Sequence, residues 1–143
     1  MIFLEEPENF TSRFEVAGCF VEHDGRILLL KRHSNKPEGG TWCGPSGKLD
    51  EDETADAAII RETKEETGLI LDPPRLEHVK KIFVVYPDYQ FIYHIFRIKI
   101  DSFPTVTISH NEHTEYTWVT PEEALDMDLI QDEDECIRLT YGI

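Results

Sequence analysis

The stretch from Gly47 to Leu69, GKLDEDETADAAIIRETKEETGL, decides the fold of this chain and carries most of its chemistry. It begins in a glycine-containing turn and continues as a strongly acidic helix that is expected to end at Gly68. Residues three and four apart lie on one face of a helix. The carboxylates of Glu62, Glu65 and Glu66 are therefore predicted to project in roughly the same direction.

The same helix face carries Ala55, Ala58 and Ile59, so a small apolar stripe is predicted to end in three carboxylates. Like charges at these spacings destabilise a helix by roughly 0.2–0.5 kcal/mol per pair, and burial adds to the cost. Arg61 can reach Glu65 but cannot neutralise all three carboxylates. Mg²⁺ could, since it takes oxygen ligands and is commonly completed by substrate phosphates. Spacing alone leaves two hypotheses open: a Mg²⁺ site for phosphate chemistry, or a solvated acidic helix face without a metal.

The stretch resembles the signature of the Nudix hydrolases, the MutT-like pyrophosphohydrolases, which is G-x5-E-x7-R-E-U-x-E-E-x-G-U with U a bulky apolar residue. One position departs from it: Thr63 replaces the usual aliphatic residue, and little effect is expected. Ser46 and Asp52 stand where glycine is frequent in the family, and no carboxylate is missing. The residues that match the signature are Gly47, Glu53, Arg61, Glu62, Glu65, Glu66, Gly68 and Leu69.

The order of elements predicted along the chain indicates a mixed sheet covered by helices rather than a regular βαβ alternation. The resemblance implies an α/β fold, the Nudix-type α/β/α sandwich with a mixed β-sheet. We expect one domain over 1–143, with 1–12 as a loose leader. The expected elements are strands over 14–22, 26–33, 76–86, 89–100 and 105–108, the signature helix from about 50–54 with an Asp50–Glu53 capping box, and helices over 121–127 and 132–139.

The reaction that the resemblance implies is Mg²⁺-dependent hydrolysis of a pyrophosphate bond in a nucleoside diphosphate linked to X, with Mn²⁺ as a substitute ion. The products are a nucleoside monophosphate and phosphate-X, where X is a phosphate, a sugar phosphate or another nucleotide. The metal ligands expected from the family are Glu62, Glu65, Glu66, Glu115 and a backbone carbonyl at Gly47.

Catalytic roles follow from the same resemblance. Glu62 is the first candidate to accept the proton of the attacking water, with Glu112 or Glu115 in reserve, and Glu65 belongs to the same carboxylate group. Arg61 is expected to orient the carboxylates. Glu53 is expected to contact the metal ligands rather than the metal, and so to fix their geometry. His110 and His113 flank Glu112 and are expected to be solvated loop residues.

Five residues are candidates for binding the substrate. Arg32 and Lys48 are expected to contact phosphates, although each also fits a solvated position. Trp42 either stacks on a base or plugs the core beneath its loop, and the second interpretation is favoured. Tyr86 and Tyr89 flank the predicted hairpin turn and could stack a nucleobase, or could be ordinary aromatic residues at strand ends. Family features near Tyr86 point both to dinucleoside polyphosphates and to ADP-ribose, so they do not decide the substrate.

Composition limits the partners of the protein. A chain of 143 residues with 40% apolar and 30% charged residues fits a soluble globular domain. Its net charge of −15 repels polyanions, so a small nucleotide is the expected partner and long nucleic acid is not. No apolar run approaches the ~20 residues that span a bilayer, and no secretory signal is present, so a cytoplasmic protein without a membrane partner is expected. Homodimers are frequent in the family, but no apolar surface pattern in this sequence shows whether this protein forms one.

Three cysteines without CxxC spacing argue against a disulfide framework or a zinc site. Buried, reduced thiols are expected, and a role for Cys43 in the loop before the signature stays open. Two functions of other classes compete with hydrolysis: a Nudix module that senses a nucleotide without cleaving it, and an isoprenoid diphosphate isomerase. The second would need Cys43 as an acid or base, and the surrounding WCGPSG does not resemble that branch.

Overall fold

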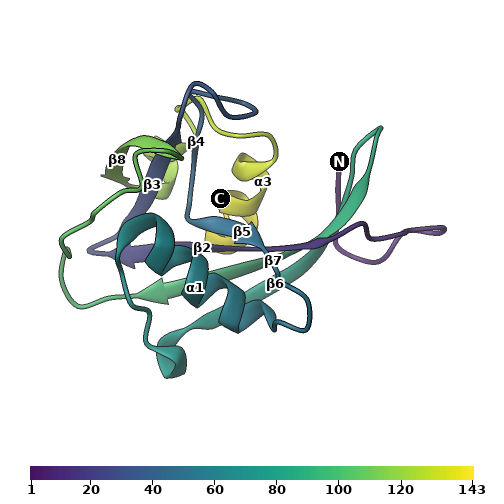
Figure 1. Ribbon diagram of the computed structural model, residues 1–143, viewed down its shortest axis with the longest axis horizontal. Coiled ribbons are helices and arrows are strands. Elements are labelled where there is room, and N and C mark those ends of the chain that lie inside the picture. Colours follow the sequence, from purple (N-terminus) through teal and green to yellow (C-terminus); the bar gives the residue numbers. More distant parts are fainter.

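The computed structural model describes residues 1–143 as a mixed β-sheet with helices on both faces (Figure 1). None of the helices is long and apolar enough to cross a membrane. The strands are β1 (Ile2–Phe3), β2 (Glu15–His23), β3 (Arg26–Arg32), β4 (Trp42–Cys43), β5 (Ser46–Lys48), β6 (Glu77–Val85), β7 (Gln90–Lys99) and β8 (His113–Val119). The helices are α1 (Ala55–Thr67), α2 (Pro121–Ala124) and α3 (Glu133–Tyr141), with a 3₁₀ turn at Pro73–Arg75.

The sheet runs in the order β1-β6-β7-β2-β3-β4, with β5 paired to β2 and β8 paired to β3. Its only parallel ladder joins β2 to β7, from Glu15 opposite Ile92 to Glu22 opposite Lys99. The neighbouring β2–β3 and β6–β7 pairs are antiparallel hairpins, as the sequence predicted. This mixture of directions, with helices on both faces, confirms the predicted α/β/α sandwich.

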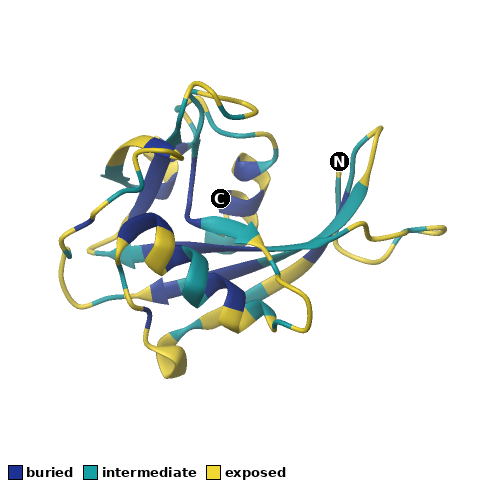
Figure 2. Cartoon of the chain, viewed as in Figure 1, coloured by how far each residue is buried: buried dark blue, intermediate teal, exposed yellow.

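A two-residue turn sets the register between β2 and β3. Asp24 and Gly25 both have positive φ, 50° and 72°, which is the backbone that a tight hairpin turn requires. The four residues that follow Arg26, Ile27 to Leu30, are completely buried, so β3 is covered on both faces. The prediction of a continuously buried second strand is confirmed (Figure 2).

Two apolar clusters lie on opposite faces of the sheet. Ala58 and Ile59 of α1 pack on one face against strand residues that include Phe96. Ala124 of α2 and Ile137 of α3 belong to the cluster on the other face. Figure 1 shows α1 across one side of the sheet and α3 on the other. The three cysteines are free and buried, as predicted.

Helix α1 begins at the end of the range that the sequence indicated. Its N-cap is Thr54, whose side chain accepts a hydrogen bond from the amide of Ala57. Asp50 and Glu53 do bond to each other, with the Asp50 amide donating to the Glu53 carboxylate at 2.9 Å. That pair closes a turn before the helix and leaves Glu53 free to face Arg61, so the predicted capping box at the helix start is wrong.

Two other predicted segments differ from the structure. Residues 2–3 are not loose, because Ile2 and Phe3 pair with Val84 and Phe83 at the edge of the sheet. No strand forms over 105–108. The amide of Thr107 instead donates to the carbonyl of Thr67 at 2.9 Å, so this segment caps the end of α1 rather than extending the sheet.

The threonine that departs from the signature is completely buried. Thr63 Oγ1 has no hydrogen-bond partner, which is costlier than the loss of one apolar contact that the sequence suggested. Thr67, one turn later and equally buried, donates its hydroxyl to the Thr63 carbonyl at 2.6 Å and accepts from the Leu69 amide.

Replacing Thr63 by Val is expected to raise the free energy of unfolding by about 1 kcal/mol, because an unpaired hydroxyl is exchanged for a methyl group of the same shape. Thr67→Val is the matched control and is expected to lower it by about the same amount, since it loses a hydrogen bond. Urea unfolding of both variants measures the difference. A destabilised Thr63→Val protein would contradict the assignment.

A buried carboxyl group ties α3 to the loop before the signature. Glu133 is 5% exposed, and its Oε2 accepts a hydrogen bond from the Gly44 amide at 3.1 Å. Burial raises the pKa of Glu133 to about 7, against the opposing effect of the Gly44 bond. The folded protein therefore holds a proton at pH values where the unfolded chain has lost it.

This difference predicts a pH dependence of stability. Raising the pH from about 4.5 to 7 should lower the free energy of unfolding through Glu133 by on the order of 3 kcal/mol, with no further loss well above pH 7. Glu133→Gln keeps an oxygen for Gly44 but cannot titrate. Its stability relative to wild type is therefore expected to rise over the same window, measured by denaturant unfolding at several pH values. A constant difference between the two proteins would refute this.

Candidate active site

Arg61 organises the signature helix and the turn before it. Its guanidinium donates two hydrogen bonds to Glu53, both 2.9 Å, one to Glu62 at 2.8 Å and one to the Lys48 carbonyl at 3.1 Å. The bonds from Arg61 lower the pKa of Glu53 to about 2, with help from the Asp50 amide. Arg61 thus fixes one carboxylate on the helix and one on the turn, in agreement with the orienting role expected for it.

Glycine at position 47 is needed for the Glu62 carboxylate to reach the turn. Gly47 lies in β5, and a Cβ atom added there would collide with the carboxylate of Glu62. The backbone of this turn and the side chain of Glu62 therefore lie in direct contact. The expectation that a backbone carbonyl near Gly47 joins the metal site remains a proposal.

Glu66 is the most deeply buried carboxyl of the signature, at 3% exposure. Burial, the hydrogen bond and charge of Glu62, and the charge of Glu112 together raise its pKa to about 9, against a hydrogen bond from the Ser46 backbone. Glu65 points elsewhere: its side chain is 57% exposed and lies 3.5 Å from Arg61. The three carboxylates therefore do not share one direction, since Glu65 is turned toward the rim.

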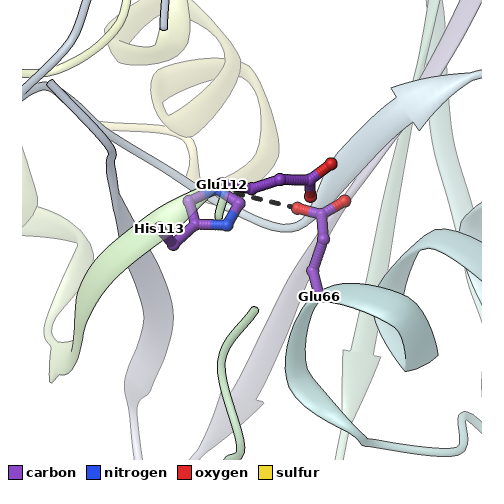
Figure 3. A group of neighbouring side chains, drawn as sticks. All are labelled: Glu66, Glu112 and His113. Carbon is purple, nitrogen blue, oxygen red and sulfur yellow. Dashed lines mark ion pairs between the residues drawn. The ribbon is translucent and has the colours of Figure 1, made fainter. Parts of the chain in front are cut away.

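The chain brings two further residues to Glu66 from the start of β8. His113 Nε2 lies 3.8 Å from Glu66 Oε1, and one donor atom each from Glu66, Glu112 and His113 lie within 4.8 Å of one another (Figure 3). Burial, followed by the charges of Arg32 and Lys36, lowers the pKa of His113 to about 4, so the ring is neutral at pH 7.

Sequence reasoning missed His113, which is 4% exposed rather than solvated. A bulge explains the error. β3 steps once from Lys31 to Arg32 while its partner β8 steps twice, from Glu115 to His113, so Thr114 is an extra residue. His113 and Glu115 consequently face opposite sides of the sheet, although their spacing in a regular strand would put them on the same side. The sequence carried no signal for this irregularity.

Glu115 lies apart from the carboxylate group. Its side chain is 60% exposed and pairs with Lys31 at 3.4 Å. Glu112, the reserve candidate, lines the cleft together with Glu62 and Glu66. Glu112, and not Glu115, is therefore the carboxylate of this segment that lies beside Glu62 and Glu66.

These residues line an open cleft of about 520 Å³ without any hydrophobic lining residue. Three cations, Arg32, Lys36 and Lys48, face the same space as the carboxylates. Lys48 Nζ lies 4.2 Å from the centre of the Phe14 ring, and Arg32 Nε donates to the Pro37 carbonyl at 2.9 Å. These contacts hold Lys48 and Arg32 at the cleft. A phosphate chain bound there would therefore meet the positive charges of both side chains.

A second cavity of about 190 Å³ adjoins the cleft at Ser46, which lines both. Its walls are mostly apolar and include Tyr86 and Tyr89, whose rings meet edge to face at 5.5 Å. The Tyr86 hydroxyl donates to Asp132 at 2.9 Å, which fixes that ring at the cavity wall.

Trp42 does not line this cavity. It packs against the cluster beneath α2 and α3 and pairs with Leu129. The structure therefore favours the interpretation of Trp42 as a core plug over a base-stacking role.

The donor set suits a divalent cation. Glu66 is buried beside Glu62 and Glu112, and its nearest cationic candidate, His113, is neutral. Carboxylates gathered in this way repel one another, and a cation among them removes the repulsion. Glu62, Glu66, Glu112 and His113 are the residues placed to hold it.

Comparisons with known proteins agree with this geometry. The family described as NUDIX domain matches residues 12–140. A MutT-like protein of Streptomyces ambofaciens is 32% identical over 86% of this chain and 76% of its own length. The CTP pyrophosphohydrolase of Escherichia coli is 30% identical over 78% of each chain.

Solved structures show the same fold. The MutT protein of Methanosarcina mazei superposes with a TM-score of 0.74 at 25% identity, covering 87% of this chain and 90% of that one. The NUDIX domain of Shewanella oneidensis NrtR, solved with ADP ribose, gives a TM-score of 0.78 at 20% identity, covering 96% and 92%. With every carboxylate of the signature present and the family match spanning nearly the whole sequence, this chain belongs to the Nudix family and is a pyrophosphohydrolase.

Proposed function

We propose that the protein hydrolyses a pyrophosphate bond of a nucleoside triphosphate or a related nucleoside diphosphate linked to X, with a divalent cation, Mg²⁺ or in its place Mn²⁺, held by Glu62, Glu66 and Glu112. The observation that carries the proposal is the polar cleft in which three cations and three carboxylates face the same space. Such a cleft suits a phosphate chain accompanied by a metal, which would neutralise negative charge on the phosphates and lower the pKa of bound water.

Each protein group has a role in this proposal. Lys48 and Arg32, which both line the cleft, bind phosphate oxygens. Glu62, held by Arg61 at 2.8 Å, is placed to ligate metal and to accept the proton of the attacking water. Glu112 is the reserve for the proton, because it lines the same cleft and makes no ion pair within the protein. Glu53 keeps Arg61 in place and does not reach the substrate.

The adjoining cavity is evidence that the substrate carries a nucleoside and is not inorganic pyrophosphate alone. Its aromatic and apolar walls suit a base, and Tyr86 and Tyr89 supply ring faces and edges for stacking. Shared lining by Ser46 places this cavity directly beside the phosphate cleft. The cytosine nucleotide named for the E. coli relative belongs to this class, and ADP-ribose and dinucleoside polyphosphates are the alternatives.

The test is release of phosphate and pyrophosphate over a panel of CTP, other NTPs and dNTPs, 8-oxo-dGTP, ADP-ribose, nucleotide sugars and diadenosine polyphosphates with Mg²⁺ or Mn²⁺. Turnover of one class identifies X. A competing function, nucleotide sensing without cleavage, predicts silence over the panel together with protection against thermal unfolding by a nucleotide.

Glu66→Gln is expected to lower kcat at least about a hundredfold, because it removes a charged oxygen from the metal group without changing shape. The matched control is Glu135→Gln, which makes the same charge change on the exposed face of α3. Folding is checked by thermal unfolding of each variant. Wild-type turnover by a folded Glu66→Gln protein would remove Glu66 from the site.

Glu112 and Glu115 form a second matched pair, three residues apart and both exposed. Glu112→Gln is expected to lower kcat/KM at least about tenfold through weaker metal binding, whereas Glu115→Gln should change it less than about twofold, because its carboxylate pairs with Lys31 outside the cleft. Steady-state kinetics over a range of Mg²⁺ concentrations measures both effects. The reverse order would restore Glu115 as the ligand.

A further inference from the structure

The imidazole of His113 is buried and makes no hydrogen bond within the protein. Its Nδ1 has no partner, and its Nε2 contact with Glu66, at 3.8 Å, is too long for a hydrogen bond. His113 lines the same cleft as Glu66 and Glu112, so a group bound in that cleft can supply the partner that Nε2 lacks within the protein. Figure 3 shows its ring facing the Glu66 carboxylate.

We propose that His113 is a nitrogen ligand of the metal ion held by Glu66 and Glu112, and that this ligand strengthens the binding of Co²⁺, Ni²⁺ and Zn²⁺ much more than that of Mg²⁺. The inference rests on the proposed function in one respect, namely that this cleft is the metal centre. It goes beyond it by assigning a ligand outside the signature and a class of ion.

Geometry supports the assignment. Bonds from a metal to imidazole nitrogen or carboxylate oxygen are about 2.0–2.2 Å long, so one ion can touch both Nε2 of His113 and Oε1 of Glu66 across 3.8 Å. A Glu112 oxygen lies within 4.8 Å of the other two atoms. The three donors come from two segments, the end of α1 and the start of β8, which the Ser109 amide joins by a 3.3 Å bond to the Glu66 carbonyl.

The chemistry of the donors decides the ion. Mg²⁺ takes oxygen ligands and seldom uses imidazole, whereas Co²⁺, Ni²⁺ and Zn²⁺ all bind imidazole nitrogen readily. The imidazole therefore adds a nitrogen ligand that Co²⁺, Ni²⁺ and Zn²⁺ use more readily than Mg²⁺ does, beside carboxylates that bind all four ions.

The competing interpretation gives His113 a positioning role, in which its ring only orients the Glu66 carboxylate. Loss of such a contact would weaken the binding of every divalent ion by the same factor. Loss of a nitrogen ligand would weaken Co²⁺ and Zn²⁺ and spare Mg²⁺. The two interpretations therefore differ in ion selectivity rather than in activity.

The experiment titrates Co²⁺, Zn²⁺ and Mg²⁺ into wild type, His113→Gln and the control His110→Gln by calorimetry, with the absorption spectrum of the Co²⁺-loaded proteins recorded alongside. His110 is exposed in the same loop. We expect His113→Gln to weaken Co²⁺ and Zn²⁺ about ten- to a hundredfold, to change Mg²⁺ affinity less than about threefold, and to alter the Co²⁺ spectrum. His110→Gln should leave all three affinities unchanged.

Equal weakening of all three ions, or no change, would overturn the ligand assignment. His113→Cys keeps a soft ligand and is expected to retain Zn²⁺ binding, which a positioning role does not predict. If neither variant folds, ¹⁵N NMR of the histidine rings in wild type with added Zn²⁺ gives the answer: an unchanged buried imidazole would overturn the proposal.

Nucleotide hydrolysis with Mg²⁺ is measured on the same samples. Turnover with unchanged Co²⁺ affinity in His113→Gln overturns the ligand and leaves the proposed function standing. Loss of Co²⁺ affinity without turnover of any nucleotide supports the ligand and counts against the proposed function.

Discussion

The Arg61 guanidinium is the interaction on which the site depends. It bonds Glu53 on the turn, Glu62 on the helix and the Lys48 carbonyl at the end of β5. These three partners come from three successive pieces of the signature, so one planar side chain fixes their mutual orientation. Arginine suits this task because its donors are fixed in a planar fork, which a flexible lysine could not reproduce.

That arrangement leaves some carboxylates paired with a cation and others unpaired. Arg61 satisfies Glu53 and part of Glu62, while Glu66 is left buried without a strong cation. The result is a cleft in a protein of net charge −15 where a divalent ion and a phosphate chain gain from meeting unpaired charges of both signs. An overall acidic surface is compatible with phosphate binding because three cations gather locally in the cleft.

Much of the fold was predictable because its determinants are local. The Asp24–Gly25 turn, the apolar run of β3 and the β6–β7 hairpin each follow from residues that are neighbours in sequence. The predicted capping box of Asp50 and Glu53 and the predicted strand over 105–108 were wrong for the opposite reason. Glu53 turns toward Arg61, and the Thr107 amide bonds the carbonyl of Thr67, and both partners lie too far along the chain for a local pattern to identify.

The sequence by itself determined which signature residues form the site. These are the carboxylates, the Arg61 that lies among them, and Gly47, which leaves room for the Glu62 carboxylate, since helical spacing and one family pattern fix all of these. Only the tertiary structure decided which groups from outside the signature lie beside these carboxylates. A bulge at Thr114 turns His113 inward and leaves Glu115 beside Lys31, and the sheet brings Glu112 to Glu66. The physical reason is that strand register and bulges depend on pairing between segments about eighty residues apart, as with Lys31 and Glu115, and no local pattern in either strand specifies them.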